Sequence, residues 1–187
     1  PNGYRIYAKH REMDETQWHL IGVSPISTDC HKPATVSGGG KSEISKSITD
    51  AIILGNAYVA DFDADKAASM VEFFGLPTDR RLSEMSKGMG EKLQISLIMS
   101  RRARVYLLDE PISGVDPATR DVILEGILRE FDPASLLIMS TPLISDIEHF
   151  VDYALFLKDG QVLLQGDADD LRAAHGDSLD AIFRKEY

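Results

Sequence analysis

Residues 82–116 read LSEMSKGMGEKLQISLIMSRRARVYLLDEPISGVD, and this stretch carries the clearest structural pattern in the chain. Ser86 is placed to begin a helix that reaches about Met99. The four apolar residues 105–108 then form the continuous run that is typical of a buried parallel strand, and two acids follow at its end. We therefore expect a helix and a parallel strand, with carboxylates at the carboxyl edge of a sheet, where open α/β sheets bind their ligands.

The residues after this stretch continue the α/β pattern. Asp116 is a helix N-cap residue, and Pro117 fits the first helical position. Asp159 and Gly160 form the turn of a hairpin that favours positive φ. The pattern predicts a strand over 135–140 and helices over 144–150, 168–174 and 178–186.

Upstream, the pattern is weaker. A helix from residue 43 should end at Gly55, and a second helix from Asp65 should end at Gly75. Short strands are predicted over 4–9, 18–23, 34–36 and 56–60.

Composition excludes several classes of protein. The formal net charge is −10, and residues 61–187 carry all of it, since residues 1–60 hold six basic and six acidic residues. An acidic surface repels phosphate backbones, so we expect no nucleic-acid partner. The single cysteine, Cys30, fits a reducing compartment, and neither a signal peptide nor an apolar run of membrane-spanning length is visible.

Two carboxylates carry the predicted chemistry. Asp109 is suited to hold Mg²⁺ beside nucleotide phosphates, and Glu110 is placed to polarise a water for attack on a γ-phosphate. For two acids alone, a solvated acidic turn would be the preferred interpretation. However, Ser86 precedes Asp109 by 23 residues, with a helix and a strand between them. Its helix start offers N–H groups to an anion, although such serines are usually ordinary caps.

With these motifs in order, residues 61–187 resemble the second half of an ABC-type ATPase domain. MSKGM (85–89) resembles the signature motif LSGGQ, and VYLLDEP (105–111) resembles Walker B. SGVD (113–116) resembles the D-loop, and FLKDGQVLLQGD is typical of the hairpin that follows.

This resemblance implies a dimer in which two ATP-binding domains enclose two nucleotides. Ser86, Gly88 and Met89 would face ATP held by the partner, and Asp116 would contact the partner. The cofactors implied are ATP and Mg²⁺. The family's full domains power transport, so a transmembrane permease is a further implied partner. The expected location is the cytoplasm, peripherally at the inner face of the membrane through that permease.

One departure concerns hydrolysis. The family carries a switch histidine in a pattern like STHLISD, and this chain reads STPLISD, so Pro142 stands at the histidine position. Proline has no side-chain donor and no backbone N–H. His149 is better explained as a surface residue than as a replacement. We therefore expect hydrolysis to be weak or absent.

The phosphate-binding loop is imperfect. TVSGGGKS (35–42) matches the Walker A pattern at Gly40, Lys41 and Ser42, but Thr35 replaces its first glycine. Gly38, Gly39 and Gly40 would present N–H groups, Lys41 would reach phosphate, and Ser42 would ligate Mg²⁺. A flexible loop with a solvated lysine is the alternative. Lys41 precedes Ser86 by only 45 residues, and no Q-loop glutamine is assigned.

Tyr4, Tyr7 and Trp18 are candidates for stacking on adenine, although ordinary packing explains each better.

A second resemblance concerns residues 30–65, which are similar to a stretch of the large pyrophosphate-utilising phosphoenolpyruvate carboxykinases. It implies a chimeric or designed chain, joined near DFDAD, with an N-terminal segment 1–60 and an ABC-like segment 61–187. Asp61, Asp63 and Asp65 lie at this junction. A polar connection with a helix cap explains them better than a metal site, because no calcium loop is completed.

The sequence thus predicts an α/β fold: a truncated P-loop NTPase-like parallel sheet with flanking helices and a C-terminal β-hairpin. The favoured function is Mg-ATP binding with impaired hydrolysis. The alternatives are a domain that binds no nucleotide and a phosphate or pyrophosphate site formed by Ser37–Ser42.

Overall fold

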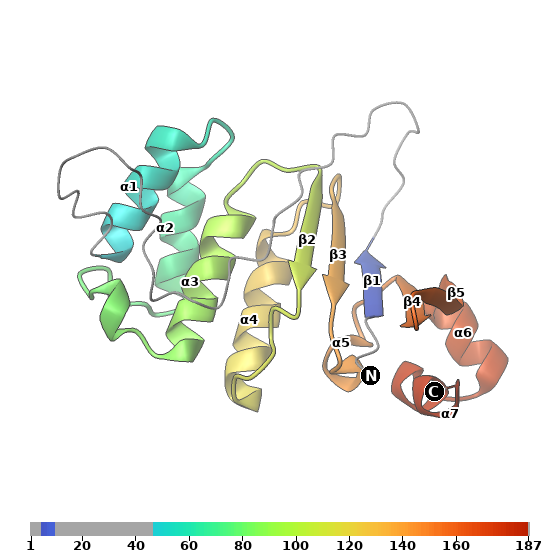
Figure 1. Cartoon of the computed structure of the whole chain (residues 1–187). Helices are drawn as coiled ribbons and strands as arrows, with labels where there is room; N and C mark the ends of the chain where they lie inside the picture. Colours follow the sequence, from blue (N-terminus) through green and yellow to red (C-terminus); the bar gives the residue numbers. More distant parts are fainter. Residues whose placement is uncertain (1–4, 10–46, 187) are drawn as a thin grey trace. The chain divides into compact units, whose positions relative to one another are not determined.

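The structure is a computed structural model that describes residues 5–9 and 47–186 (Figure 1). It divides into two compact units, of which one includes 47–102 and the other includes 5–9 and 103–186 among the described residues. The predicted boundary after residue 60 rests on motifs rather than on packing, and it stays a prediction.

The first unit is helical. It contains α1 (Ile48–Tyr58), α2 (Ala64–Phe73), the 3₁₀ turn η1 (Leu82–Glu84) and α3 (Lys87–Met99). Ser47 begins α1 through a capping box with Asp50, since each side chain accepts from the other residue's backbone N–H. The helices pack through fully or almost fully buried side chains, namely Ile48, Ala67, Met70, Val71, Leu93, Ile95 and Met99.

Gly55 does not end α1 as the sequence predicted, because the helix continues to Tyr58. The glycine has a packing role instead. A Cβ added at Gly55 would lie 2.8 Å from the Phe62 ring, so the ring would have to move if residue 55 carried a side chain. The strand predicted over 56–60 is therefore wrong, since 56–58 form the last turn of α1. By contrast, Gly75 has φ +63 just after α2, as a C-terminal stop requires.

The second unit is built on a five-stranded sheet with the order β2-β3-β1-β4-β5. The strands are β1 (Arg5–Lys9), β2 (Val105–Asp109), β3 (Leu136–Ser140), β4 (Tyr153–Lys158) and β5 (Gln161–Asp167). The predicted parallel sheet is confirmed for β2 and β3, which lie side by side in Figure 1. The other pairings are antiparallel, with β1 between β3 and β4.

Helices complete this unit. They are α4 (Pro117–Glu130), α5 (Ile144–Ile147), α6 (Ala168–His175) and α7 (Leu179–Glu186). Ile123 and Ile127 of α4 are fully buried, and Phe156 of β4 packs edge-on against Phe183 of α7 with ring centroids 5.3 Å apart. The hairpin turn is confirmed, because both Asp159 and Gly160 have positive φ. The two C-terminal helices also lie where the sequence predicted them.

Candidate functional site

The predicted acidic edge lies at the carboxyl end of the parallel pair. Asp109 is the last residue of β2 and stands opposite Ser140, the last residue of β3. The Ser140 hydroxyl donates a hydrogen bond to the Asp109 carboxylate. Asp109 and Glu110 are both exposed, whereas Val105, Tyr106 and the other inward residues of β2 are buried. The strand is therefore anchored in the core and presents two carboxylates to solvent at its end.

Glu110 has an unusual backbone. Its φ is +46, in the left-handed region that a non-glycine residue adopts at a cost. Its N–H donates to the Ser140 carbonyl at 2.9 Å and lies 3.1 Å from the Ser140 hydroxyl oxygen, which also accepts from it. Ser140 thus contacts both acids, and it holds the backbone at the start of the turn that follows β2.

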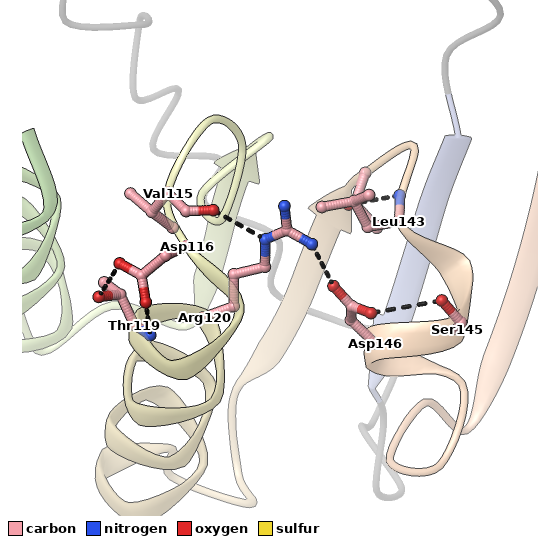
Figure 2. A network of polar contacts seen from close by, with 8 residues as sticks. Val115, Asp116, Thr119, Arg120, Leu143, Ser145 and Asp146 are labelled. Carbon is pink, nitrogen blue, oxygen red and sulfur yellow. Dashed lines mark hydrogen bonds and ion pairs between the residues drawn. The ribbon is translucent and has the colours of Figure 1, made fainter.

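The turn after Glu110 is pinned to the core. Ile112 is fully buried and Val115 almost so, while Ser113 N–H donates to the Glu110 carbonyl at 3.0 Å. Asp116 then caps α4 as predicted: its carboxylate accepts from the Thr119 N–H at 3.0 Å and from the Thr119 hydroxyl at 2.7 Å (Figure 2). Asp116 is exposed. The proposed contact of Asp116 with a partner stays a prediction.

The signature-like residues belong to the helical unit. Ser86 is the N-cap of α3, and its hydroxyl accepts from the Met89 N–H at 3.3 Å. Ser86 is exposed, and Gly88 and Met89 are half-buried. The first turn of a helix leaves N–H groups that an anion can accept from. The structure thus confirms the cap and the helix, and contact with a nucleotide stays a prediction.

Glu91 lies one turn into the same helix. Burial raises the pKa of its carboxyl above the ordinary value, and the ammonium group of Lys87 opposes this shift. The sequence does not indicate this half-buried carboxyl, because Glu91 has the pattern of an ordinary surface residue.

Pro142 follows β3 and is exposed. The preceding Thr141 is 2% exposed, and its hydroxyl oxygen accepts from the Leu143 N–H at 3.0 Å. His149 lies in an exposed turn after α5, which agrees with the expectation that it is a surface residue. The assignment of Pro142 to the histidine position of the resembled motif stays a prediction.

The glycine-rich loop of residues 35–42 is not among the described residues. Gly38, Gly39, Gly40, Lys41 and Ser42 all lie outside the described residues, and their phosphate-binding role stays a prediction. Two of the aromatic candidates for stacking, Tyr4 and Trp18, also lie outside them, while Tyr7 is part of β1.

The acids at the predicted junction serve the helical unit. Asp63 is the N-cap of α2, and the Arg101 guanidinium pairs with Asp61 at 2.6 Å. The backbone N–H of Lys66 and the side chain of Arg102 hold the pKa of Asp63 below its ordinary value. Among residues 5–9 and 47–186, no group of three or more acids, histidines and cysteines is arranged to hold a metal ion.

A hollow of about 500 Å³ lies elsewhere in the sheet unit. Its lining comes from α4 and from α5 with the turn after it, and includes Leu124, Asp146 and Phe150. Asp109, Glu110 and Asp116 do not line it. The hollow is therefore separate from the acidic edge.

Comparison with known proteins gives two kinds of relative. Over 129 residues the chain is 48% identical to the PPi-type phosphoenolpyruvate carboxykinase of Propionibacterium freudenreichii, which covers 68% of this chain and 11% of that protein. Over 110 residues it is 28% identical to the ABC transporter ATP-binding protein YxlF of Bacillus subtilis, which covers 58% of this chain and 37% of that protein. No family model matches.

A solved structure of similar fold belongs to the same class of protein as the second relative. The ATP-binding subunit of an ABC transporter superposes with a TM-score of 0.63 at 23% identity, over 75% of this chain and 62% of that one. The fold is thus that of part of an ABC-type ATP-binding cassette. Both resemblances predicted from the motifs are confirmed: the chain has ABC transporter ATP-binding proteins and PPi-type carboxykinases among its relatives.

These relatives are matched over only part of their length. The 129-residue match is also longer than the stretch 30–65 on which the carboxykinase resemblance rests. Since the two matches cover 68% and 58% of the chain, they overlap. Within the described ranges, no helix combines the length and apolarity that a bilayer crossing needs.

Proposed function

We propose that this chain is an ABC-type ATP-binding module that binds Mg-ATP and hydrolyses it slowly or not at all. The observation that carries the proposal is the acidic edge, where a buried parallel strand ends in exposed Asp109 and Glu110, both contacted by Ser140. The relationship to ABC transporter ATP-binding proteins supports it.

The donor set at this edge suits magnesium. Mg²⁺ prefers oxygen ligands, and a carboxylate with a neighbouring hydroxyl offers these without any sulfur or nitrogen competitor. Asp109 would hold the ion, together with Ser42. When bound, Mg²⁺ neutralises charge on the nucleotide phosphates.

The remaining groups divide the other tasks. Glu110 would accept a proton from the attacking water, since its carboxylate is exposed at the edge. Gly38, Gly39, Gly40 and Lys41 would hold the phosphates, and Ser86, Gly88 and Met89 would contact ATP held by a second ATP-binding domain. Pro142 offers no hydrogen-bond donor, which is the reason for expecting weak hydrolysis. A transmembrane permease is the proposed further partner.

Calorimetric titration tests this proposal. Mg-ATP and Mg-pyrophosphate are titrated separately into the chain, into Lys41→Ala and into Asp109→Asn. Saturable ATP binding that both substitutions weaken supports the proposal. No heat with either ligand supports a module that binds no nucleotide.

A second candidate function rests on the match to the PPi-type carboxykinase. Its proposed site is the segment Ser37–Ser42, which would bind phosphate or pyrophosphate through backbone N–H groups and Lys41. In the same titration, binding of pyrophosphate alone, lost in Lys41→Ala and kept in Asp109→Asn, would favour this function over the first.

A further inference from the structure

One arginine side chain joins the turn before α4 to helix α5. Arg120 Nε donates to the Val115 carbonyl at 3.1 Å, and its terminal nitrogen donates to the Asp146 carboxylate at 3.1 Å (Figure 2). The Val115 carbonyl belongs to the turn that leads from Glu110 into α4. Asp146 belongs to α5, which follows the turn after β3. The guanidinium therefore lies between the D-loop-like turn and the segment that includes Pro142.

Both ends of this connection are anchored. Asp116 caps α4, and its carbonyl accepts from the Arg120 N–H at 3.0 Å, so the arginine extends from the first turn of a fixed helix. On the other side, Asp146 N–H donates to the Leu143 carbonyl at 3.3 Å, and the Ser145 hydroxyl donates to the Asp146 carboxylate at 3.3 Å.

The pair is also shielded from water. The exposed fractions of the side chains are 23% for Arg120 and 27% for Asp146, against 53% for Arg129 near the end of the same helix. Shielded charged pairs contribute more than surface pairs do. Only a planar guanidinium can donate in two fixed directions at once, because a lysine ammonium is a single point charge on a flexible stem. Arg120 is therefore suited to fix two segments, whereas Arg129 pairs with its own neighbour Glu130.

We propose that Arg120 is a positioning residue that fixes the 113–116 turn relative to the 141–146 segment, and thereby presents Asp116 to a second copy of the chain. The inference rests on the proposed function, in which this turn faces the partner domain. It implies that Arg120 governs association at saturating Mg-ATP while leaving the affinity of one chain for Mg-ATP unchanged.

The first test needs no nucleotide. Amide hydrogen exchange is followed at Ser113, whose N–H donates to the Glu110 carbonyl. In Arg120→Gln and in Asp146→Asn this amide should exchange about tenfold faster, as expected when a hydrogen bond to a charged group is lost. In the double variant the Ser113 amide should exchange less than about twofold faster than in Arg120→Gln, because both substitutions break the same connection. Arg129→Gln is the matched control and should leave the amide unchanged. An unchanged Ser113 in both single variants would overturn the proposal.

The second test measures association. Sedimentation at saturating Mg-ATP is compared in a Glu110→Gln background, which slows hydrolysis. Arg120→Gln should weaken self-association about tenfold, equivalent to roughly 1.4 kcal/mol, with the Mg-ATP affinity of the chain unchanged. Arg120→Lys should recover part of the loss, since the ammonium keeps one of two contacts, and Arg129→Gln should match the parent. Equal association of Arg120→Gln and the parent would overturn the positioning role. A parent that binds no Mg-ATP overturns the proposed function instead, and the exchange comparison then decides whether Arg120 fixes the two turns.

Discussion

The hydroxyl of Ser140 donates to the carboxylate of Asp109, directly across the parallel pair of β2 and β3. The same residue accepts the backbone N–H of Glu110 through its carbonyl and its hydroxyl oxygen. The two acids at the end of β2 are therefore not independent of the neighbouring strand. Ser140 belongs to neither of the stretches 105–111 and 113–116 that carry the predicted motifs.

Removal of this hydroxyl should be measurable. Ser140→Ala should lower the free energy of unfolding by about 1 kcal/mol, because one charge-assisted hydrogen bond and one acceptor for Glu110 are lost. Urea unfolding followed by circular dichroism measures the change. Ser145→Ala is the matched control, since the Ser145 hydroxyl makes one longer bond of 3.3 Å to the Asp146 carboxylate, and its removal should cost clearly less. Equal losses would mean that Ser140 does not stabilise the edge.

The backbone of Glu110 leads to a second prediction. Glu110→Gly should raise the free energy of unfolding by about 0.5–1 kcal/mol, because glycine adopts φ near +46 without strain. This net gain already allows for the entropy that glycine adds to the unfolded chain. Glu110→Gln keeps the strain and should leave stability unchanged. Thermal unfolding of the two variants side by side makes the comparison. A Glu110→Gly variant less stable than Glu110→Gln would contradict the strain at this position.

Much of the fold is predictable from local pattern. The strand 105–109 and the helices that Ser86 and Asp116 cap follow from apolar runs and capping residues, and all are found. The α1 boundary was not predictable in this way, because the reason that Gly55 lies inside a helix is the Phe62 ring, a tertiary contact. Likewise, the sequence indicates a strand near residue 5, but not that it pairs antiparallel on both sides.

The candidate site was predictable only in part. Asp109, Glu110 and Asp116 were identified from their motifs, and the structure places them on one edge strand and its turn. The contact between Ser140 and Asp109 does not follow from the motifs, because it depends on the register of β2 and β3. The prediction that both strands end at one edge of the sheet was the available signal for it. Arg120 was missed because nothing in its sequence spacing indicates a pairing with Asp146, 26 residues away.

Gly55 and Gly90 should respond oppositely to alanine. Gly55→Ala should destabilise by about 1–2 kcal/mol, because its Cβ would lie 2.8 Å from the Phe62 ring and the ring must move. Gly90→Ala meets no atom within 4 Å and should stabilise by about 0.5–1 kcal/mol through helix propensity. Urea unfolding measures both. A stabilising Gly55→Ala would show that the ring has room to relax.

The raised pKa of Glu91 predicts a pH dependence of stability. In the window between the ordinary glutamate value, about 4.3, and the higher folded value, the folded state binds more protons than the unfolded state. The free energy of unfolding should therefore fall as pH rises through this window. Glu91→Gln should remove that fall. The difference in free energy of unfolding between Glu91→Gln and the parent should therefore grow as the pH rises and then become constant. Urea unfolding at a series of pH values measures this. The exposed Glu84→Gln serves as control, and parallel curves for the parent and Glu91→Gln would refute the assignment.

The proposed weakness of hydrolysis can be tested at Pro142 by a substitution that should increase the rate of Mg-ATP hydrolysis. Because Pro142 is exposed, histidine fits there without burying a polar ring, and it restores a side chain that can donate a hydrogen bond. Pro142→His should raise the rate of Mg-ATP hydrolysis about tenfold or more, as expected for a positioned polar group. Release of inorganic phosphate measures this rate. Addition of Glu110→Gln to Pro142→His should abolish the gain, because the proton of the attacking water then has no acceptor. Equal rates in the parent and in both variants would show that neither position acts on the reaction, even if ATP binds.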